Sequence, residues 1–212
     1  MSADGAAPSE VELEAGGHVK GLATAIVRQN KDDSGRVCVR VSYPWHSQPR
    51  QSYPARLATP MAGKDRGMYF VPEVNDEVVV GFLKGSMEHP LVLGSLWNGV
   101  DSSPETNSDG KNDKRLIRSR KGHQLSFDDG AKGVVQVELN DGKKLRLDDD
   151  GITLEDTNGN KLSVQSSSGN VTLEAKGKLT LKGTSVSVEA TSELNLRASG
   201  VASLSGTPVK IN

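Results

Sequence analysis

The sequence predicts an all-β protein in which a small Greek-key barrel precedes a long stack of short strands. Three observations support this fold class. No segment has the apolar spacing of an amphipathic helix. Residues 18–100 hold several short apolar segments separated by turn residues. Beyond residue 121 an apolar–polar–apolar unit recurs every seven to ten residues.

The bulk composition limits the classes of function. The chain has 212 residues, a formal net charge of −1 and only 4% aromatic residues. The near-zero net charge argues against a general polyanion binder, and the few aromatic residues argue against a conventional globular core. Much of the chain is therefore expected to pack in a fibrous or intersubunit manner.

The N-terminal residues and the cysteine content indicate a compartment. Residues 1–17 are small, acidic and glycine-rich, so we expect a flexible tail without a signal peptide. Cys38 is the only cysteine, which excludes an intrachain disulfide, and its strand context favours a buried apolar role. These features predict a soluble protein made in a reducing cytoplasm.

Residues 18–100 are expected to form the barrel. Valines alternate over residues 37–41, and the polar loop 29–35 joins this strand to the preceding one as a hairpin. Four prolines then interrupt a long connection. The expected strands cover residues 18–28, 37–41, 77–83 and 91–96.

A polar, turn-rich linker or neck over residues 101–120 separates the barrel from the repeats at 121–212. Each repeat places two aliphatic side chains on one strand face and a polar side chain on the other. Two such side chains cannot offset a backbone entropy of about 1–2 kcal/mol per residue, so the units must stack.

The repeat interval favours three chains wound about one axis. An interval centred on eight residues is too short for one chain to complete a three-sided turn. In a three-chain prism the ladder runs between chains and the apolar pairs meet at the axis. We assign this axial core to Ile152, Leu154, Leu162, Val164, Val171, Leu173, Leu179, Leu181, Val186, Val188, Leu194 and Leu196. An ordinary β-sandwich remains the alternative, although its strands usually extend over about 5–6 residues.

Two phrases in the barrel region carry a family resemblance. They are PEVNDEV at residues 72–78 and HPLVLG at residues 89–94. Residues 50–99 resemble the oligonucleotide/oligosaccharide-binding (OB) barrel in the central spike proteins of contractile injection systems. These are the VgrG-type proteins and phage baseplate assembly protein V. Residues 121–129 resemble the neck of these proteins.

The resemblance covers about residues 18–212 and implies a fold and partners. It implies a homotrimer in which three OB-fold barrels form a collar and the C-terminal region forms an intertwined, triple-stranded β-helix. A hub protein of the baseplate, and indirectly the inner tube, would bind at the OB end. A PAAR-repeat tip protein would bind at Val209, Lys210, Ile211 and Asn212. VgrG-type proteins carry a hub region before the barrel, so here the hub is expected to be another polypeptide. The linker of residues 101–120 is too short for the lysozyme domain that some phage spikes insert.

The titratable residues give no pattern typical of an enzyme or a metal site. The four histidines lack the paired spacing of metal ligands, so no cofactor is expected. An axial ion on three copies of His123 stays open as an alternative. The acidic run at residues 148–150 lacks the alternating ligands of a calcium loop and is interpreted as a solvated turn.

A basic run follows the linker, at Arg115, Arg118, Arg120 and Lys121. Contact with an acidic hub and a solvated neck are equally good interpretations of it. No nucleic-acid binding is expected, because a barrel fold alone does not supply a basic groove with stacking aromatic residues. No catalytic triad or phosphate-binding loop occurs.

The expected function is therefore that of a non-enzymatic spike in a phage tail, a secretion machine or a contractile particle, made in the bacterial cytoplasm. Sheath contraction would drive it through the target envelope, so that contact with the target membrane is only transient. The alternatives are a β-helical tail-fibre protein that binds a receptor and a carbohydrate-active protein.

Overall fold

A computed structural model describes residues 13–14, 18–46 and 50–210 of the chain. The described part divides into two compact units, with the boundary between Ser108 and Asp109. Each unit is described by itself below. Most of the expected N-terminal tail and the last two residues of the expected tip, Ile211 and Asn212, lie outside the described residues. Within those described ranges, no helix is long and apolar enough to cross a membrane.

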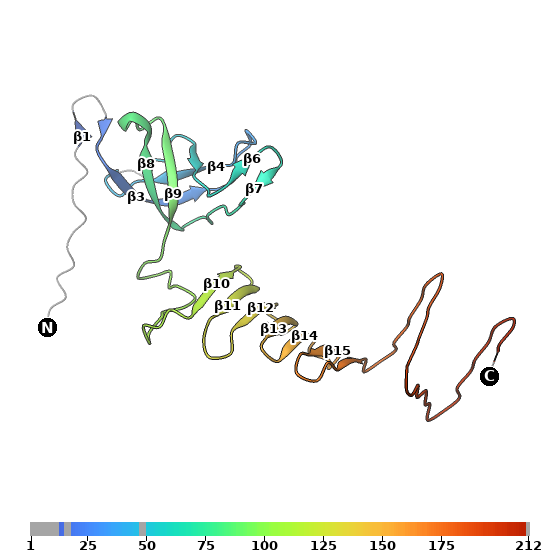
Figure 1. The fold of residues 1–212 in the computed structure, drawn as a ribbon. Helices are drawn as coiled ribbons and strands as arrows, with labels where there is room; N and C mark the ends of the chain where they lie inside the picture. The colour runs from blue at the N-terminus through green and yellow to red at the C-terminus, as the bar shows by residue number, and fades with distance from the viewer. Residues whose placement is uncertain (1–12, 15–17, 47–49, 211–212) are drawn as a thin grey trace. The chain divides into compact units, whose positions relative to one another are not determined.

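The first unit is a closed five-stranded barrel (Figure 1). Around the barrel the strands follow the order β3-β4-β5-β9-β8, and β8 closes it by pairing with β3. Strands β5 and β9 pair in parallel, whereas the other neighbours are antiparallel. This is a Greek-key arrangement, as expected. The barrel strands are β3 (Leu22–Gln29), β4 (Cys38–Ser42), β5 (Ala55–Leu57), β8 (Glu77–Phe82) and β9 (Pro90–Leu96).

Valines from three strands fill the barrel core. They alternate along β3, β4 and β8 because successive side chains of a strand point to opposite faces. The largest fully buried side chains are Val27, Val39, Val41, Val78, Val80 and Pro90. Cys38 is 5% exposed, which agrees with its expected role as a small buried residue. The hairpin expected around residues 29–35 is present as the antiparallel pair β3–β4.

The short elements around the barrel differ from the sequence-based expectation. Strand β1 (Leu13–Glu14) lies in the segment expected to be a flexible tail, but it pairs with β2 (His18–Val19). The single strand expected over residues 18–28 is divided at Gly21, whose φ of +83° interrupts the extended backbone. A ribbon of β6 (Ala62–Gly63) and β7 (Arg66–Gly67) and a 3₁₀ turn at Leu83–Gly85 complete the unit.

The loop between β3 and β4 is organised by one carboxylate. Asp32 accepts hydrogen bonds from the backbone N–H groups of Ser34, Arg36 and Cys38 at 3.0–3.2 Å. It also accepts the hydroxyl of Ser34 at 2.6 Å. These bonds, the Ser34 hydroxyl above all, lower the pKa of Asp32 to about 2.

The Asp32 loop therefore has a predictable response to acid. Because the pKa of Asp32 is depressed in the folded state, the ionised carboxylate stabilises the fold fully above about pH 3.8. This stabilisation is lost as the pH falls through about 2. In an NMR titration, the amide signals of Arg36 and Cys38 should move with a midpoint near pH 2. Asp32→Ala should displace the same signals at neutral pH, whereas Asp33→Ala should not. A midpoint at the ordinary aspartate value would contradict this account.

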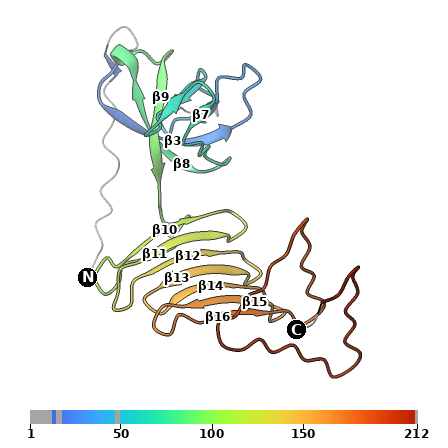
Figure 2. The ribbon, with the colours of Figure 1, turned by 45° about the vertical axis from the view of Figure 1, so that its right-hand side comes forward.

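The second unit is a meander of seven antiparallel strands in strict chain order (Figure 2). Each strand is four or five residues long and pairs with the next one along the chain. The strands are β10 (Lys114–Arg118), β11 (Gln124–Asp128), β12 (Val134–Glu138), β13 (Lys144–Asp148), β14 (Gly151–Glu155), β15 (Lys161–Gln165) and β16 (Val171–Glu174). All six doublets expected from Leu125 to Leu173 lie on strands.

The expectation that the ladder runs between chains is wrong for this meander. From β10 to β16 each strand bonds to its sequence neighbour in the same chain. The physical reason lies in the turns, which are short and carry glycine at positive φ, as at Gly122, Gly142 and Gly159. Such turns close hairpins directly. Strand β10 falls within the segment expected to be the linker, and Arg115 and Arg118 lie on it.

Beyond β16 the chain has no strand pairing up to Lys210, the last described residue. The doublets from Leu179 onward are extended segments without a ladder partner in the same chain (Figure 2). Leu179, Leu181, Val186 and Val188 are 52–69% exposed, and Leu196 is 85% exposed. The backbone N–H and C=O groups of the meander are therefore paired within the chain, whereas the segment 175–210 has no such ladder in its own chain.

Candidate assembly site: an uncovered apolar sheet face

One face of the meander carries two columns of apolar side chains. The pairing register places the residues of each column directly opposite one another on successive strands. The leucine-rich column consists of Ile117, Leu125, Val137, Leu145, Leu154, Leu162 and Leu173. The second column begins with Arg115 and continues through Phe127, Val135, Leu147, Ile152, Val164 and Val171.

This apolar face is more exposed than the polar face behind it. Eleven of its aliphatic and aromatic side chains are 38–66% exposed, from Leu145 at the lower end to Val171 at the upper end. On strands β12 to β14 the polar residues between them are only partly exposed. A folded chain normally shows the opposite distribution, and an exposed apolar patch of this kind marks an interaction surface.

The opposite face carries a column of alternating charges. Successive strands place Glu138, Lys144, Glu155, Lys161 and Glu174 opposite one another. Lys144 and Glu155 form an ion pair at 2.7 Å, and the hydrogen bond from Lys144 lowers the pKa of Glu155. Alternating cross-strand charges favour this register over a shifted one. The charges of the polar face thus find their partners within the sheet itself.

Three of the loops at one end of the strands share one conformation. In each loop, the backbone N–H of the first residue donates to the carbonyl of the fifth. The backbone N–H of a glycine in fourth position donates to the carbonyl of the first residue. These loops also contact one another, since Asn140 donates its backbone N–H to Nδ1 of His123 at 3.3 Å. Likewise, Lys176 donates its backbone N–H to Oδ1 of Asn160 at 2.9 Å. The loops are residues 119–123, 139–143 and 156–160.

The expected axial residues fall into two groups. Ile152, Leu154, Leu162, Val164, Val171 and Leu173 lie together on the apolar face, whereas the six from Leu179 to Leu196 lie in the unpaired segment. The axial core assigned from the sequence began only at Ile152, so the doublets from Leu125 to Leu147 were expected as strands but not as part of this face, and Ile117 was not expected on it. The same alternation of apolar and polar residues marks this earlier part of the face, but the irregular spacing between residues 125 and 152 hid its continuity with the later units.

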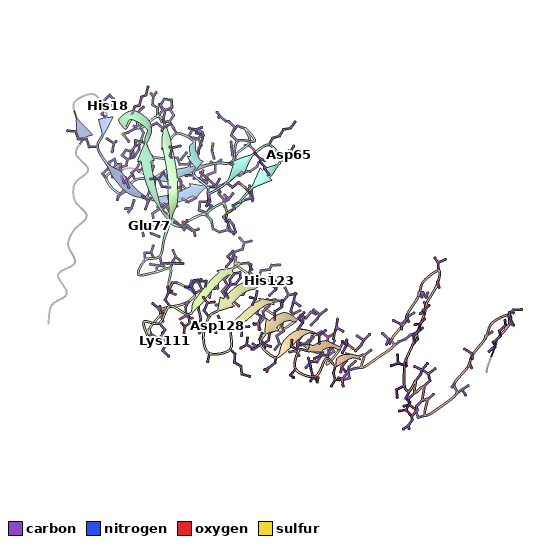
Figure 3. All side chains as sticks on the ribbon, viewed as in Figure 1. His18, Asp65, Glu77, Lys111, His123 and Asp128 are labelled. Carbon is purple, nitrogen blue, oxygen red and sulfur yellow. The ribbon has the colours of Figure 1, made fainter. Side chains whose placement is uncertain are left out.

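The other residues singled out from the sequence lie outside this face. His123 sits in the loop between β10 and β11 (Figure 3). Asp148 accepts the N–H groups of Asp150 and Gly151, so this acidic run forms a tight turn. A hydrogen bond from Arg146 lowers the pKa of Asp148. In the part of the chain that the structure describes, no group of three histidine, cysteine or acidic residues could hold a metal ion.

The basic run does not form one patch of equivalent residues. Arg115 lies at the start of the second apolar column and donates to Asp129 at 2.6 Å. Arg118 ends β10, and Arg120 and Lys121 lie in the following loop. Only the last three belong to the same end of the strands.

The barrel carries a separate groove of about 470 Å³ beside β5 and the β6–β7 ribbon. Three arginines and several exposed apolar side chains line it, among them Tyr69 and Phe70 at 75% and 65% exposure. The arginines are Arg36, Arg56 and Arg66. The sequence did not reveal this groove, because its residues come from two separated segments, 36–37 and 56–71.

Comparison with known proteins identifies the barrel. Residues 23–97, which include all five barrel strands except the first residue of β3, match the family of type VI secretion system/phage-baseplate injector OB domains. The barrel is an injector OB domain. The resemblance to central spike proteins noted in the sequence is therefore confirmed.

Relatives of the injector OB domain extend the comparison beyond the barrel. The type VI secretion system spike protein VgrG3 of Vibrio cholerae is 32% identical over 132 residues, which are 56% of this chain and 12% of the relative. The spike protein VgrG1a of Pseudomonas aeruginosa is 31% identical over 94 residues, 41% of this chain and 15% of the relative. The actin cross-linking toxin VgrG1 of Vibrio cholerae is 30% identical over 118 residues, 51% of this chain and 10% of the toxin. The chain thus spans about an eighth of the length of these relatives.

Proposed function

We propose that this protein is a structural, non-enzymatic spike of a contractile injection machine, and that it acts as a homotrimer that pierces the target envelope. The observation that carries the proposal is the uncovered apolar face of the meander in a protein that also has an injector OB domain. The similarity to spike proteins supports the same function. The toxin among the relatives is named for an actin cross-linking activity, and that activity is not part of the proposal.

The meander supplies one wall of a three-sided prism in this proposal. Three sheets with their apolar faces inward would bury the two columns around a common axis and leave the charged column outside. Seven strands at the usual spacing extend over roughly 28 Å along the axis. Burying about ten half-exposed apolar side chains per chain favours association strongly, at about 25 cal/mol per Å² removed from water.

The unpaired segment 175–210 favours three chains over two. Its doublets recur every seven or eight residues, as from Leu179 to Val186 and from Val186 to Leu194. Extended backbone groups need ladder partners, and in the trimer the other two chains supply them. The needle thus continues from three meanders into a segment where the ladder runs between chains, as the intertwined β-helix requires.

The mechanical role follows from this construction. A prism with a ladder along its whole length is stiff, and unfolding one interwound strand breaks contacts with two other chains, which makes unfolding slow. The charged outer face offers little apolar surface for adhesion during passage. In the proposal the OB barrels face a hub protein and the inner tube, and a PAAR-repeat tip protein covers the strand ends around Val209 and Lys210 by strand addition.

Light scattering on the purified chain tests the proposal. The expected mass is three times 22.5 kDa, retained at moderate denaturant concentration. Leu181→Asp should shorten the intertwined segment and make it sensitive to proteases, because it places three carboxylates at the axis. Thr180→Asp, one residue earlier on the outer face, is the matched control and should behave like the wild type. A monomeric wild-type chain would rule out the trimeric needle.

A further inference from the structure

The two loop edges of the meander carry opposite charge, and we propose that the acidic edge of one copy docks on the basic edge of the next, in a seam that fixes all chains parallel. The inference rests on the proposed trimer and adds to it the residues that join neighbouring copies. It assigns the strand ends, rather than the sheet faces alone, as a recognition surface for a second copy of this chain.

The acidic edge collects the turns β11–β12, β13–β14 and β15–β16 and the strand ends beside them. Its charged residues are six acidic and two basic ones, a net charge of −4: Asp113, Asp128, Asp129, Asp148, Asp149 and Asp150 against Lys114 and Lys132. Three cations form ion pairs with this edge: Lys132 with Asp150 at 3.0 Å, Arg115 with Asp129 at 2.6 Å and Arg146 with Asp148 at 2.6 Å. The two arginines lie further along their strands, and when they are counted as well the net charge is −2. Asp128, labelled in Figure 3, marks its position.

The basic edge lies at the other end of the same strands, where His123 marks it in Figure 3. It collects the three similar loops and the segment after β16. Eight basic residues face five acidic ones, a net charge of +3: Arg118, Arg120, Lys121, Lys143, Lys144, Lys161, Lys176 and Lys178 against Glu138, Asp141, Glu155, Asp156 and Glu174. Three ion pairs lie within the edge, Lys143 with Asp141, Lys144 with Glu155 and Lys176 with Glu174.

The charge asymmetry selects one orientation of neighbouring sheets. When sheets are related by rotation about the direction in which the strands stack, each acidic edge meets the basic edge of the next copy. When they are related by a two-fold axis along the strands, like edges meet, and like charges repel. The observed pattern therefore favours a cyclic, parallel assembly, whose contacts are heterologous and close into a ring.

A hollow at the basic edge can receive side chains from the acidic edge of the neighbouring copy. It measures about 710 Å³ and lies over the leucine-rich column, with Leu145, Leu154 and Leu162 among its lining residues. Four lysines and three acidic residues also line it, a net charge of +1: Lys143, Lys144, Lys161 and Lys178 against Glu155, Asp156 and Glu174. The second apolar column lies next to the acidic edge, because Val135 and Ile152 are each one residue from that end of their strands. A neighbouring copy would thus bring apolar side chains and carboxylates together to a hollow that has an apolar floor and a rim of net positive charge.

Charge reversal of each edge, alone and together, tests the seam in the full-length chain. The acidic-edge variant is Asp129→Lys with Asp149→Lys and Asp150→Lys, which changes the edge charge from −4 to +2. The basic-edge variant is Lys121→Glu with Lys143→Glu and Lys178→Glu, which changes it from +3 to −3. All six side chains are exposed, so each contributes little to the folding stability of its own chain. The double variant carries all six changes and restores opposite charges across the seam.

The readout is light scattering and analytical ultracentrifugation at about 50 and about 500 mM salt. Between these two concentrations the Debye length shortens roughly threefold. Each single-edge variant should assemble about tenfold more weakly than the wild type at low salt, and the deficit should shrink at high salt. The double variant should regain wild-type assembly. Single-edge variants that assemble like the wild type, or a double variant weaker than either, would overturn the seam. A monomeric wild-type chain would instead overturn the trimer, so the two failures are distinguishable.

Discussion

Leu154→Asp is expected to abolish assembly of the meander. Leu154 lies in the middle of the leucine-rich column, between Leu145 and Leu162 on the neighbouring strands. In a trimer the substitution brings three carboxylates to one level of the axis, and each costs about 3 kcal/mol or more when it is buried without a partner. Light scattering should show a monomer, and the apolar face should bind a hydrophobic dye.

The control for this experiment is one residue away. Thr153 lies on the opposite face, paired with Arg146 and Ser163, where an added charge stays in solvent. Thr153→Asp should retain the mass and the melting temperature of the wild type within a few degrees. Equal loss of assembly in both variants would mean that the strand itself tolerates no aspartate, and the assignment of an inward face would be contradicted.

Gly151→Ala is expected to unpair β14 from β15. Gly151 has φ of +145°, and a Cβ atom built on it overlaps the carbonyl oxygen of Val164 across the ladder. Backbone atoms cannot move aside as a flexible side chain can, so the cost combines conformational strain with steric overlap, about 3 kcal/mol or more. The melting temperature of the second unit, followed by circular dichroism, should fall by several degrees.

Gly169→Ala separates the steric part of that effect from the conformational part. Gly169 also has positive φ, at +67°, but an added Cβ meets nothing within 4 Å. Its substitution should cost about 1–2 kcal/mol from the backbone conformation alone. If the two variants were equally destabilised, the close approach of the Gly151 and Val164 backbones would not hold in solution.

The sequence predicted the strands well where side-chain alternation was regular. Every expected doublet from Leu125 to Leu173 lies on a strand, because a buried or interfacial face imposes a period of two. Strand β5 was missed because Pro54 precedes its three residues, and β10 because charged residues flank Leu116 and Ile117. Neither strand shows enough alternation to be distinguished from a loop.

Alternation alone could not decide which chain supplies the partner of each strand. The same apolar–polar–apolar unit suits a hairpin and an interwound ladder, and only the turn conformation distinguishes them. Glycines at positive φ close hairpins as far as Gly169, whereas the later units are separated by segments without such turns. The charged edges were also invisible from the sequence, since Asp129 and Asp149 come together only when the meander is folded.

The change of pairing at Glu174 has a consequence for the order of assembly. The meander can form in each chain as soon as that chain is synthesised, since all its hydrogen-bonded neighbours are close in sequence. In the proposed trimer, association of the meanders then tethers three copies of residues 175–210 at one end. Their effective concentration rises to the millimolar range expected for short tethers, so interwinding becomes an intramolecular step. The first unit that winds sets the register of the three chains, and each following unit then winds in the same register, starting from the meander and proceeding toward Lys210.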